Sequence, residues 1–136
     1  MLVISPSEPY GAEELKALFS SVGWSDGLSA DTLLAAMRNS SHAVTARMDG
    51  VLVGIVRSMD DGIWSANIDC MVVHAAYQRR GIAGAMLRAL LHELSGIRYI
   101  SVAPNDAGTV PLYLKNGFTL IEDGRLLQRE QKGGEA

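Results

Sequence analysis

A strand-like run, a basic turn with two glycines and an amphipathic helical run follow one another between residues 68 and 94. The apolar residues 68–73 predict a strand and residues 85–94 predict a helix. The turn between them reads Gln78-Arg79-Arg80-Gly81-Ile82-Ala83-Gly84. The first N–H groups of a helix have no intrahelical partner, and the helix dipole favours an anion beside them. We therefore predict an anion site. The glycines allow close approach and the arginines add charge, which favours a ligand with phosphates.

The spacing of this turn excludes two common phosphate-binding motifs. A P-loop requires G-x-x-x-x-G-K-[ST], and a dinucleotide-binding turn requires G-x-G-x-x-G after a strand, and neither pattern matches here. The turn does contain Q-x-x-G-x-A, formed by Gln78, Gly81 and Ala83. This pattern resembles the acyl-CoA signature of the GNAT superfamily of N-acetyltransferases.

A second segment strengthens the resemblance. Residues 110–118 read V-P-L-Y-L-K-N-G-F, which is similar to the L-Y-x-x-x-G-F segment of the same superfamily. It lies about 30 residues downstream of the first motif, a separation that fits one helix and one strand. The two segments and their connection cover residues 68–118, while the N-terminal third matches only in the order of its elements.

Periodicity along the chain predicts an α/β (α+β) domain with the element order β-α-α-β-β-β-α-β-α-β-β. An Asp-Gly pair at 49–50 predicts a hairpin, and the crossover rule makes the strand at 98–102 parallel to its predecessor. The resemblance implies the acyl-CoA N-acyltransferase fold, a mixed, mostly antiparallel sheet flanked by helices. In that fold the fourth and fifth strands splay apart around the pantetheine arm. The predicted strands are 2–5, 43–48, 51–59, 64–73, 98–102, 118–122 and 126–129, and the remaining predicted helices are 12–21, 29–38 and 109–115.

Composition indicates an ordinary globular protein. We predict one domain over residues 1–130 and a flexible polar tail over 131–136 in this chain of 136 residues. Its 48% hydrophobic content is typical of a soluble domain, and a net charge of -3 argues against a nucleic-acid partner. The single cysteine, Cys70, fits a reducing compartment. We see no apolar run long enough to span a membrane and no secretory signal, so we predict a cytoplasmic protein without a membrane partner.

The resemblance assigns a cofactor site, with acetyl-CoA as co-substrate. Main-chain N–H groups of residues 79–84 would hold the pyrophosphate, and the end of the fourth strand would bond the pantetheine arm. The Val73 N–H would polarise the thioester carbonyl as an oxyanion donor. The superfamily often has an Asn seven places before the tyrosine, where this chain has Asp106, so Asn105 is the alternative contact. The predicted cofactor-binding residues are Met71, Val72, Val73, Gln78, Arg79, Arg80, Gly81, Ile82, Ala83, Gly84 and Asn105.

Two residues are candidates for catalysis. Tyr113 matches the general acid of the superfamily, which protonates the departing thiolate, although a helical tyrosine can also be a core residue. The superfamily often uses a Glu on the fourth strand as base, or ordered water. This strand has no Glu, so we predict Asp69 as base or amine anchor. Strand alternation puts Asp69 on the face of Met71 and Val73, and Cys70 on the other, unless a bulge breaks this parity.

The leading hypothesis is an N-acetyltransferase in which a primary amine attacks acetyl-CoA directly within a ternary complex. The acceptor would be a small-molecule or protein amine. We predict no metal, because the histidines are scattered along the chain. The alternative is a non-catalytic acyl-CoA-binding or sensing module, which the missing strand Glu favours and Tyr113 opposes. The resemblance also suggests a homodimer.

Overall fold

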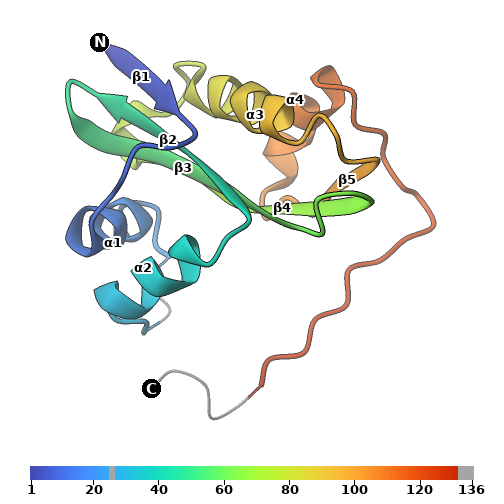
Figure 1. Cartoon of the computed structure of the whole chain (residues 1–136), viewed down its shortest axis with the longest axis horizontal. Helices are drawn as coiled ribbons and strands as arrows, with labels where there is room; N and C mark the ends of the chain where they lie inside the picture. Colours follow the sequence, from blue (N-terminus) through green and yellow to red (C-terminus); the bar gives the residue numbers. More distant parts are fainter. Residues whose placement is uncertain (25–26, 132–136) are drawn as a thin grey trace.

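The protein, seen here as a computed structural model that describes residues 1–24 and 27–131, has one sheet between two pairs of helices (Figure 1). The five strands lie in the order β1-β2-β3-β4-β5. Neighbouring strands are antiparallel except for the last pair, β4 and β5, which is parallel. The predicted mixed, mostly antiparallel sheet is therefore confirmed. The strands are β1 (Leu2–Ser5), β2 (His42–Met48), β3 (Val51–Asp60), β4 (Ser65–Val73) and β5 (Tyr99–Val102).

Helices cover both faces of the sheet. α1 (Ala12–Ser21) and α2 (Ala30–Arg38) lie on one face, and α3 (Ile82–Glu93) and α4 (Val110–Lys115) lie on the other (Figure 1). Two short 3₁₀ turns, η1 (Ala75–Tyr77) and η2 (Ala107–Thr109), precede the latter helices. None of the helices in the described ranges has the length and apolarity that a membrane span needs.

Each face of the sheet has its own hydrophobic core. On the α3 side, Met86, Leu87 and Leu90 are fully buried against Val44 and Val56 of the central strands. On the α1 side, a second set of buried residues packs on the opposite face of the same strands, among them Leu15, Leu18, Phe19, Ile55 and Val72. Because both faces of the sheet are covered, the central strand β3 is buried at every position from 52 to 56.

Most of the predicted elements are present, and α1 has the predicted bounds. Ser29 caps α2 as expected, since its hydroxyl accepts a hydrogen bond from the Thr32 N–H at 3.1 Å. α3 starts at Ile82, three residues before the predicted start at 85, so the glycine turn runs directly into the helix.

The last two predicted strands are wrong. Residues 118–122 and 126–129 form no strand, and among the described strands β5 pairs with β4 alone. After Phe118 the chain leaves the sheet as an extended segment (Figure 1). Alternating apolar residues indicate that one face of a segment could be buried if the segment were a strand. A strand forms only where a neighbouring strand makes hydrogen bonds with its main-chain N–H and C=O groups. Of the predicted tail, residues 132–136 lie outside the described residues.

Candidate functional site

The turn between β4 and α3 presents free main-chain donors at a helix N-terminus. Gly81 is the N-cap with φ 80°, and Arg79 also has a positive φ of 65°. The first intrahelical bond runs from the Ala85 N–H to the Gly81 carbonyl at 3.1 Å. Three N–H groups come before this bond and have no partner among the described residues, those of Ile82, Ala83 and Gly84. With the helix dipole behind them, they form a site for an anion.

The side chains of this turn have two roles: one fixes the turn to β4, and two carry positive charge. Gln78 is an anchor, because its Nε2 donates to the Val73 carbonyl at 3.1 Å and ties the turn to the end of β4. The Arg80 guanidinium lies over the Tyr77 ring at 5.2 Å from its centroid. Both Arg79 and Arg80 are exposed, so their charge is available to an anion at the helix start. Sequence spacing alone does not reveal this structural contact, and the part of Gln78 in cofactor binding stays a prediction.

The edge of β4 is open beside this turn. β4 runs to Val73, but its parallel pairing with β5 ends at Ile68 and Val102. Within the part of the chain that the structure describes, residues 69–73 therefore have no strand neighbour on that edge. The parallel pair ends before β4 does, as the resemblance implies, and an extended ligand arm could lie along the open edge.

The direction of the main-chain groups follows from one hydrogen bond. The His74 N–H donates to the Val53 carbonyl of β3 at 2.8 Å. Because successive N–H groups of a strand point to opposite edges, the Val73 N–H faces the open edge and the Val72 N–H faces β3. The hydrogen bond from Gln78 to the Val73 carbonyl agrees with this direction. Of the predicted contacts, Val73 therefore offers a donor at the open edge and Val72 does not.

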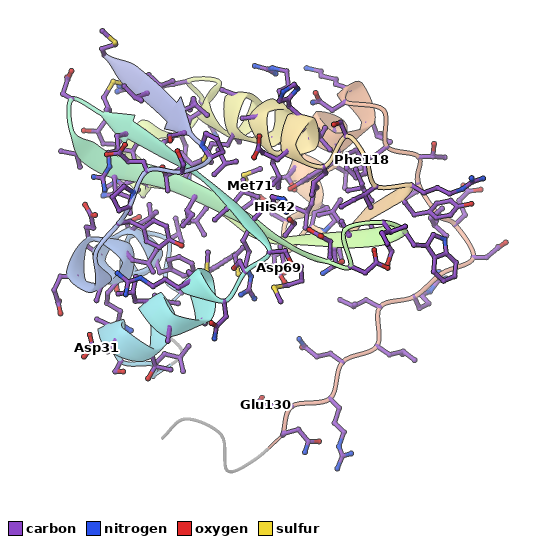
Figure 2. All side chains as sticks on the ribbon, viewed as in Figure 1. Asp31, His42, Asp69, Met71, Phe118 and Glu130 are labelled. Carbon is purple, nitrogen blue, oxygen red and sulfur yellow. The ribbon has the colours of Figure 1, made fainter. Side chains whose placement is uncertain are left out.

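A bulge in β4 changes which side chains share a face. Cys70 has a positive φ of 56°, and the register between β3 and β4 shifts between Ile55 and Arg57. Cys70 packs in the core on the α1 side, whereas Met71 and Val73 pack against the core on the α3 side. Figure 2 shows Asp69 on the α2 side of the sheet and Met71 on the α3 side. The prediction from simple alternation, that Asp69 shares the face of Met71, is therefore wrong, and so is the opposite parity of Cys70.

Asp69 is held by an arginine that sequence reasoning missed. Arg57 Nε donates to Asp69 Oδ1 at 2.6 Å, and Arg57 Nη1 donates to the Ala36 carbonyl of α2 at 3.3 Å. The Asp69 side chain remains 41% exposed, which leaves it accessible to a ligand. The sequence feature that could have revealed this pair is the position of the β3–β4 turn. A regular hairpin around residues 60–66 puts Arg57 opposite Asp69.

Burial determines the protonation state of the Cys70 thiol. Removal from water raises the pKa of its thiol to about 11, and the neighbouring Asp69 acts in the same direction. The thiol is therefore protonated at neutral pH and is a poor nucleophile, in line with the structural role that we expected.

Tyr113 of α4 is only 4% exposed, and its ring makes an edge-to-face contact with Phe118 at 5.5 Å between centroids. Burial raises the pKa of its phenol, so the group is protonated at neutral pH and can act as an acid. The ring lines a cavity of about 660 Å³ between β5, α4 and residues 118–121. Tyr113 thus packs in the core and also lines the cavity. Its position is compatible with both interpretations of the sequence, a core residue and a general acid.

The loop after β5 contains Asp106, at the position where the superfamily often has an asparagine, and Asn105 just before it. The Asp106 carboxylate caps η2 by accepting the Gly108 N–H at 2.8 Å, so this carboxylate is already used. Asn105 beside it is exposed and available. His74 is likewise used locally, because its Nδ1 accepts the Ala76 N–H at 3.0 Å. Within residues 1–24 and 27–131, no group of three or more His, Cys, Asp or Glu side chains could hold a metal ion.

Comparison with known proteins points to one family. A model of the Acetyltransferase (GNAT) family matches residues 10–118. No curated protein matches the chain.

Several solved structures have the same fold. A GNAT-family acetyltransferase from Streptococcus pneumoniae TIGR4 is 23% identical, with 97% of this chain and 99% of that chain covered and a TM-score of 0.81. A ribosomal-protein-alanine N-acetyltransferase from Brucella melitensis biovar Abortus 2308 is 19% identical, with 96% and 100% covered and a TM-score of 0.71. An aminoglycoside acetyltransferase from an uncultured soil metagenomic sample is 20% identical, with 96% and 97% covered and a TM-score of 0.68.

Proposed function

This chain belongs to the Acetyltransferase (GNAT) family, and from that premise we propose that it transfers the acetyl group of acetyl-CoA to a primary amine by direct attack within a ternary complex. One observation carries the proposal. The three free N–H groups at the start of α3 lie at the end of the same β4 edge that β5 leaves open. A phosphate site and a slot for an extended arm are thereby adjacent, as acyl-CoA requires.

In the binding step, the N–H groups at the start of α3 receive the pyrophosphate of CoA. The exposed charges of Arg79 and Arg80 neutralise part of its charge. The pantetheine arm runs along residues 69–73, where main-chain groups of the open edge bond its amides. Asn105, which is exposed after β5, bonds the arm from the other side of the gap in this proposal. Acetyl-CoA supplies the activated acyl group when it is bound.

In the chemical step, the acceptor amine attacks the thioester carbonyl carbon and forms the C–N bond. The Val73 N–H donates to the carbonyl oxygen while negative charge develops there. When the C–S bond breaks, its electron pair goes to sulfur, and Tyr113 gives its phenolic proton to the thiolate. The amine gives its proton to Asp69 or to water, and solvent returns a proton to the Tyr113 phenolate.

Asp69 also suits the binding of the acceptor. Its Oδ1 is occupied by Arg57, while the second oxygen belongs to a side chain that is partly exposed. A carboxylate fixed in this way can accept hydrogen bonds from a substrate ammonium group without moving. We propose it as the anchor of the acceptor amine.

We expect Asp69→Asn to raise the acceptor KM about fivefold or more, or to lower kcat, while acetyl-CoA affinity stays nearly unchanged. The reason is the loss of the negative charge that attracts the amine. Steady-state kinetics with varied acceptor, and calorimetric titration with acetyl-CoA, measure both effects. Asp31→Asn is the matched control, because it removes an exposed carboxylate from α2 without touching β4 (Figure 2). If Asp69→Asn lowers thermal stability and leaves turnover per folded molecule unchanged, the role is structural only.

The acceptor class is tested by thiol release from acetyl-CoA. Two proteins with this fold carry names that specify different amines, a protein alanine and an aminoglycoside. The panel therefore includes peptide N-termini, aminoglycosides and small primary amines. We expect at least one amine to release thiol well above the rate of hydrolysis without acceptor. Acetyl-CoA binding without release for any amine would instead support the sensing module, which the lack of a Glu on β4 favours.

A further inference from the structure

A second cavity lies where the end of α2 meets the loop between β1 and α1. It has a volume of about 240 Å³ and is lined by residues 6–10 of this loop, by Met37 and Arg38 of α2, and by Ala43 of β2. Met37 is buried in the core on the α1 side, so the cavity lies on the same face of the sheet as Asp69 (Figure 2). None of its lining residues, within the part of the chain that the structure describes, belongs to the predicted cofactor site.

Strand pairing puts this cavity in one row with Asp69. Ala43 of β2 pairs with Arg57 of β3, and Arg57 pairs with Asp69 of β4. Because residues directly opposite on neighbouring strands point to the same face, the three side chains form a line across the sheet. Neighbouring strands are roughly 4.8 Å apart, so two spacings put Ala43 roughly 10 Å from Asp69. The cavity and the proposed amine anchor are therefore within reach of one small molecule.

The cavity contains a cation without an ionic partner. Arg38 is exposed and takes part in no salt bridge within residues 1–24 and 27–131. Glu8 also lines the cavity, but its charge acts on another arginine. The pKa of Arg47 is raised by its hydrogen bond to Glu14 and by the charges of Glu14 and Glu8. Arg38 ends α2, where the helix dipole contributes about half a negative charge, so a positive charge remains in the cavity.

Tyr10 adds a hydroxyl donor to the same cavity. Burial raises the pKa of its phenol, while the charges of Arg38 and Arg57 nearby act in the opposite direction. The phenol is therefore protonated at neutral pH and can donate a hydrogen bond. Neither the Tyr10 hydroxyl nor the Arg38 guanidinium donates a hydrogen bond to another described residue. A guanidinium and a hydroxyl that both lack an acceptor suit a carboxylate, whose oxygens accept such bonds.

We infer that this cavity binds a carboxylate of the acceptor, so that the acceptor is a small amino acid whose amine and carboxylate are separated by several methylene groups. Arg38 and the Tyr10 hydroxyl donate to the carboxylate, and Asp69 accepts a hydrogen bond from the amine at the other end of the molecule. The inference rests on the proposed function, in which Asp69 anchors the amine.

The size of the cavity favours a small acceptor. Its volume is below the roughly 300–1,000 Å³ of a site for a drug-sized ligand, so it fits one acid group and a short chain. The separation of roughly 10 Å between Asp69 and Ala43 is too long for an amine and a carboxylate on the same carbon atom. An amine without an acid group leaves the charge of Arg38 unused.

Paired acceptors test the substrate class. Glycine, β-alanine, γ-aminobutyrate and ε-aminocaproate carry the two groups at increasing separation, and the amide of each has the same length without the negative charge. Thiol release from acetyl-CoA gives kcat/KM for every compound. We expect kcat/KM of the acids to rise with chain length, and ε-aminocaproate to exceed its amide by about tenfold or more, the effect of a hydrogen bond between charged groups.

Variants of the full chain assign this preference to the cavity. Arg38→Gln should lower the ratio of the acid and amide kcat/KM values by about fivefold or more, and Tyr10→Phe by about threefold. Arg38→Glu should reverse the preference, because its carboxylate repels that of the acceptor. Arg129→Gln is the matched control, an exposed arginine of the C-terminal segment, and should keep the parent ratio. Each ratio is measured within one variant, so a partial loss of folded protein does not change it.

Binding without turnover separates this inference from the proposed function. Calorimetric titration of the protein saturated with CoA compares ε-aminocaproate with its amide, and we expect the acid to bind about tenfold more tightly. Tighter binding of the acid without acetylation of any amine would overturn the proposed transfer and retain the acid site. Acid and amide that bind and react equally would overturn this inference and leave acetyl transfer to a primary amine intact. An acid preference that survives Arg38→Glu, or a neutral peptide amine that outperforms ε-aminocaproate, would also overturn it.

Discussion

Replacing Tyr113 with Phe should lower kcat by roughly 10²–10⁴-fold, because the variant keeps the ring and loses the proton donor for the departing thiolate. The ring contact with Phe118 and the buried packing of α4 do not involve the hydroxyl, so the fold should survive. Water can take over part of the proton transfer, so we expect the lower end of this range. Acetyl-CoA affinity should change little, since the turn before α3 is untouched. Steady-state kinetics on the best acceptor measures the effect.

The control for this substitution is Tyr99→Phe, which removes the hydroxyl of an exposed tyrosine on β5. It should leave kcat unchanged. A kcat of Tyr113→Phe within about twofold of the parent would remove Tyr113 from the mechanism, provided that chemistry limits turnover rather than product release. The pH profile adds an independent check. Because burial raises the pKa of Tyr113, the acid stays protonated as pH rises to the ordinary range of a phenol, and its loss should limit kcat only above that range.

Gly81→Glu should weaken acetyl-CoA binding by at least tenfold, or about 1.4 kcal/mol. The substitution puts a carboxylate beside the three free N–H groups of α3, where it competes with the pyrophosphate and repels it. It also puts a side chain on a residue with φ 80°, which is strained for any residue with a Cβ. Calorimetric titration with acetyl-CoA gives the affinity.

Gly81→Ala separates charge from strain. An added Cβ at this position meets no atom within 4 Å, so the alanine variant shares the backbone strain and adds neither charge nor a clash. We expect its acetyl-CoA affinity to lie much nearer the parent than that of the glutamate variant. If Gly81→Glu is folded by circular dichroism and binds acetyl-CoA as the parent does, the start of α3 is not the phosphate site.

Local sequence signals were sufficient for the elements whose reasons are local. The Asp-Gly pair at 49–50 closes the hairpin of β2 and β3, and Ser29 caps α2 through its own hydroxyl. The strand, turn and helix around Gly81 likewise depend on residues close in the chain. The same signals failed at residues 118–122 and 126–129. A strand there would have to pair with another strand such as β5, and local sequence does not determine whether the two segments meet.

In the candidate site, too, some features follow from local sequence and others only from the pairing of distant segments. Gln78, Gly81 and Ala83 mark the anion site in the sequence, since a helix start with a glycine cap is a local feature. The faces of Asp69 and Cys70 could not be read by alternation, because the bulge at Cys70 arises from the register between β3 and β4. Arg57, twelve residues before Asp69, became visible only once the two strands were paired.

The sequence by itself therefore determined the succession of elements as far as α4, the anion-binding turn and the resemblance to the family, because each depends on residues that are near one another in the chain. Only the tertiary structure showed at which residues the pairing of β4 and β5 ends, which edge of β4 the Val73 N–H faces, and that Asp69 is held by Arg57. It also decided that the C-terminal segment leaves its own sheet. These features depend on which main-chain groups of distant segments pair with each other, and the order of side chains along one segment carries little information about that pairing.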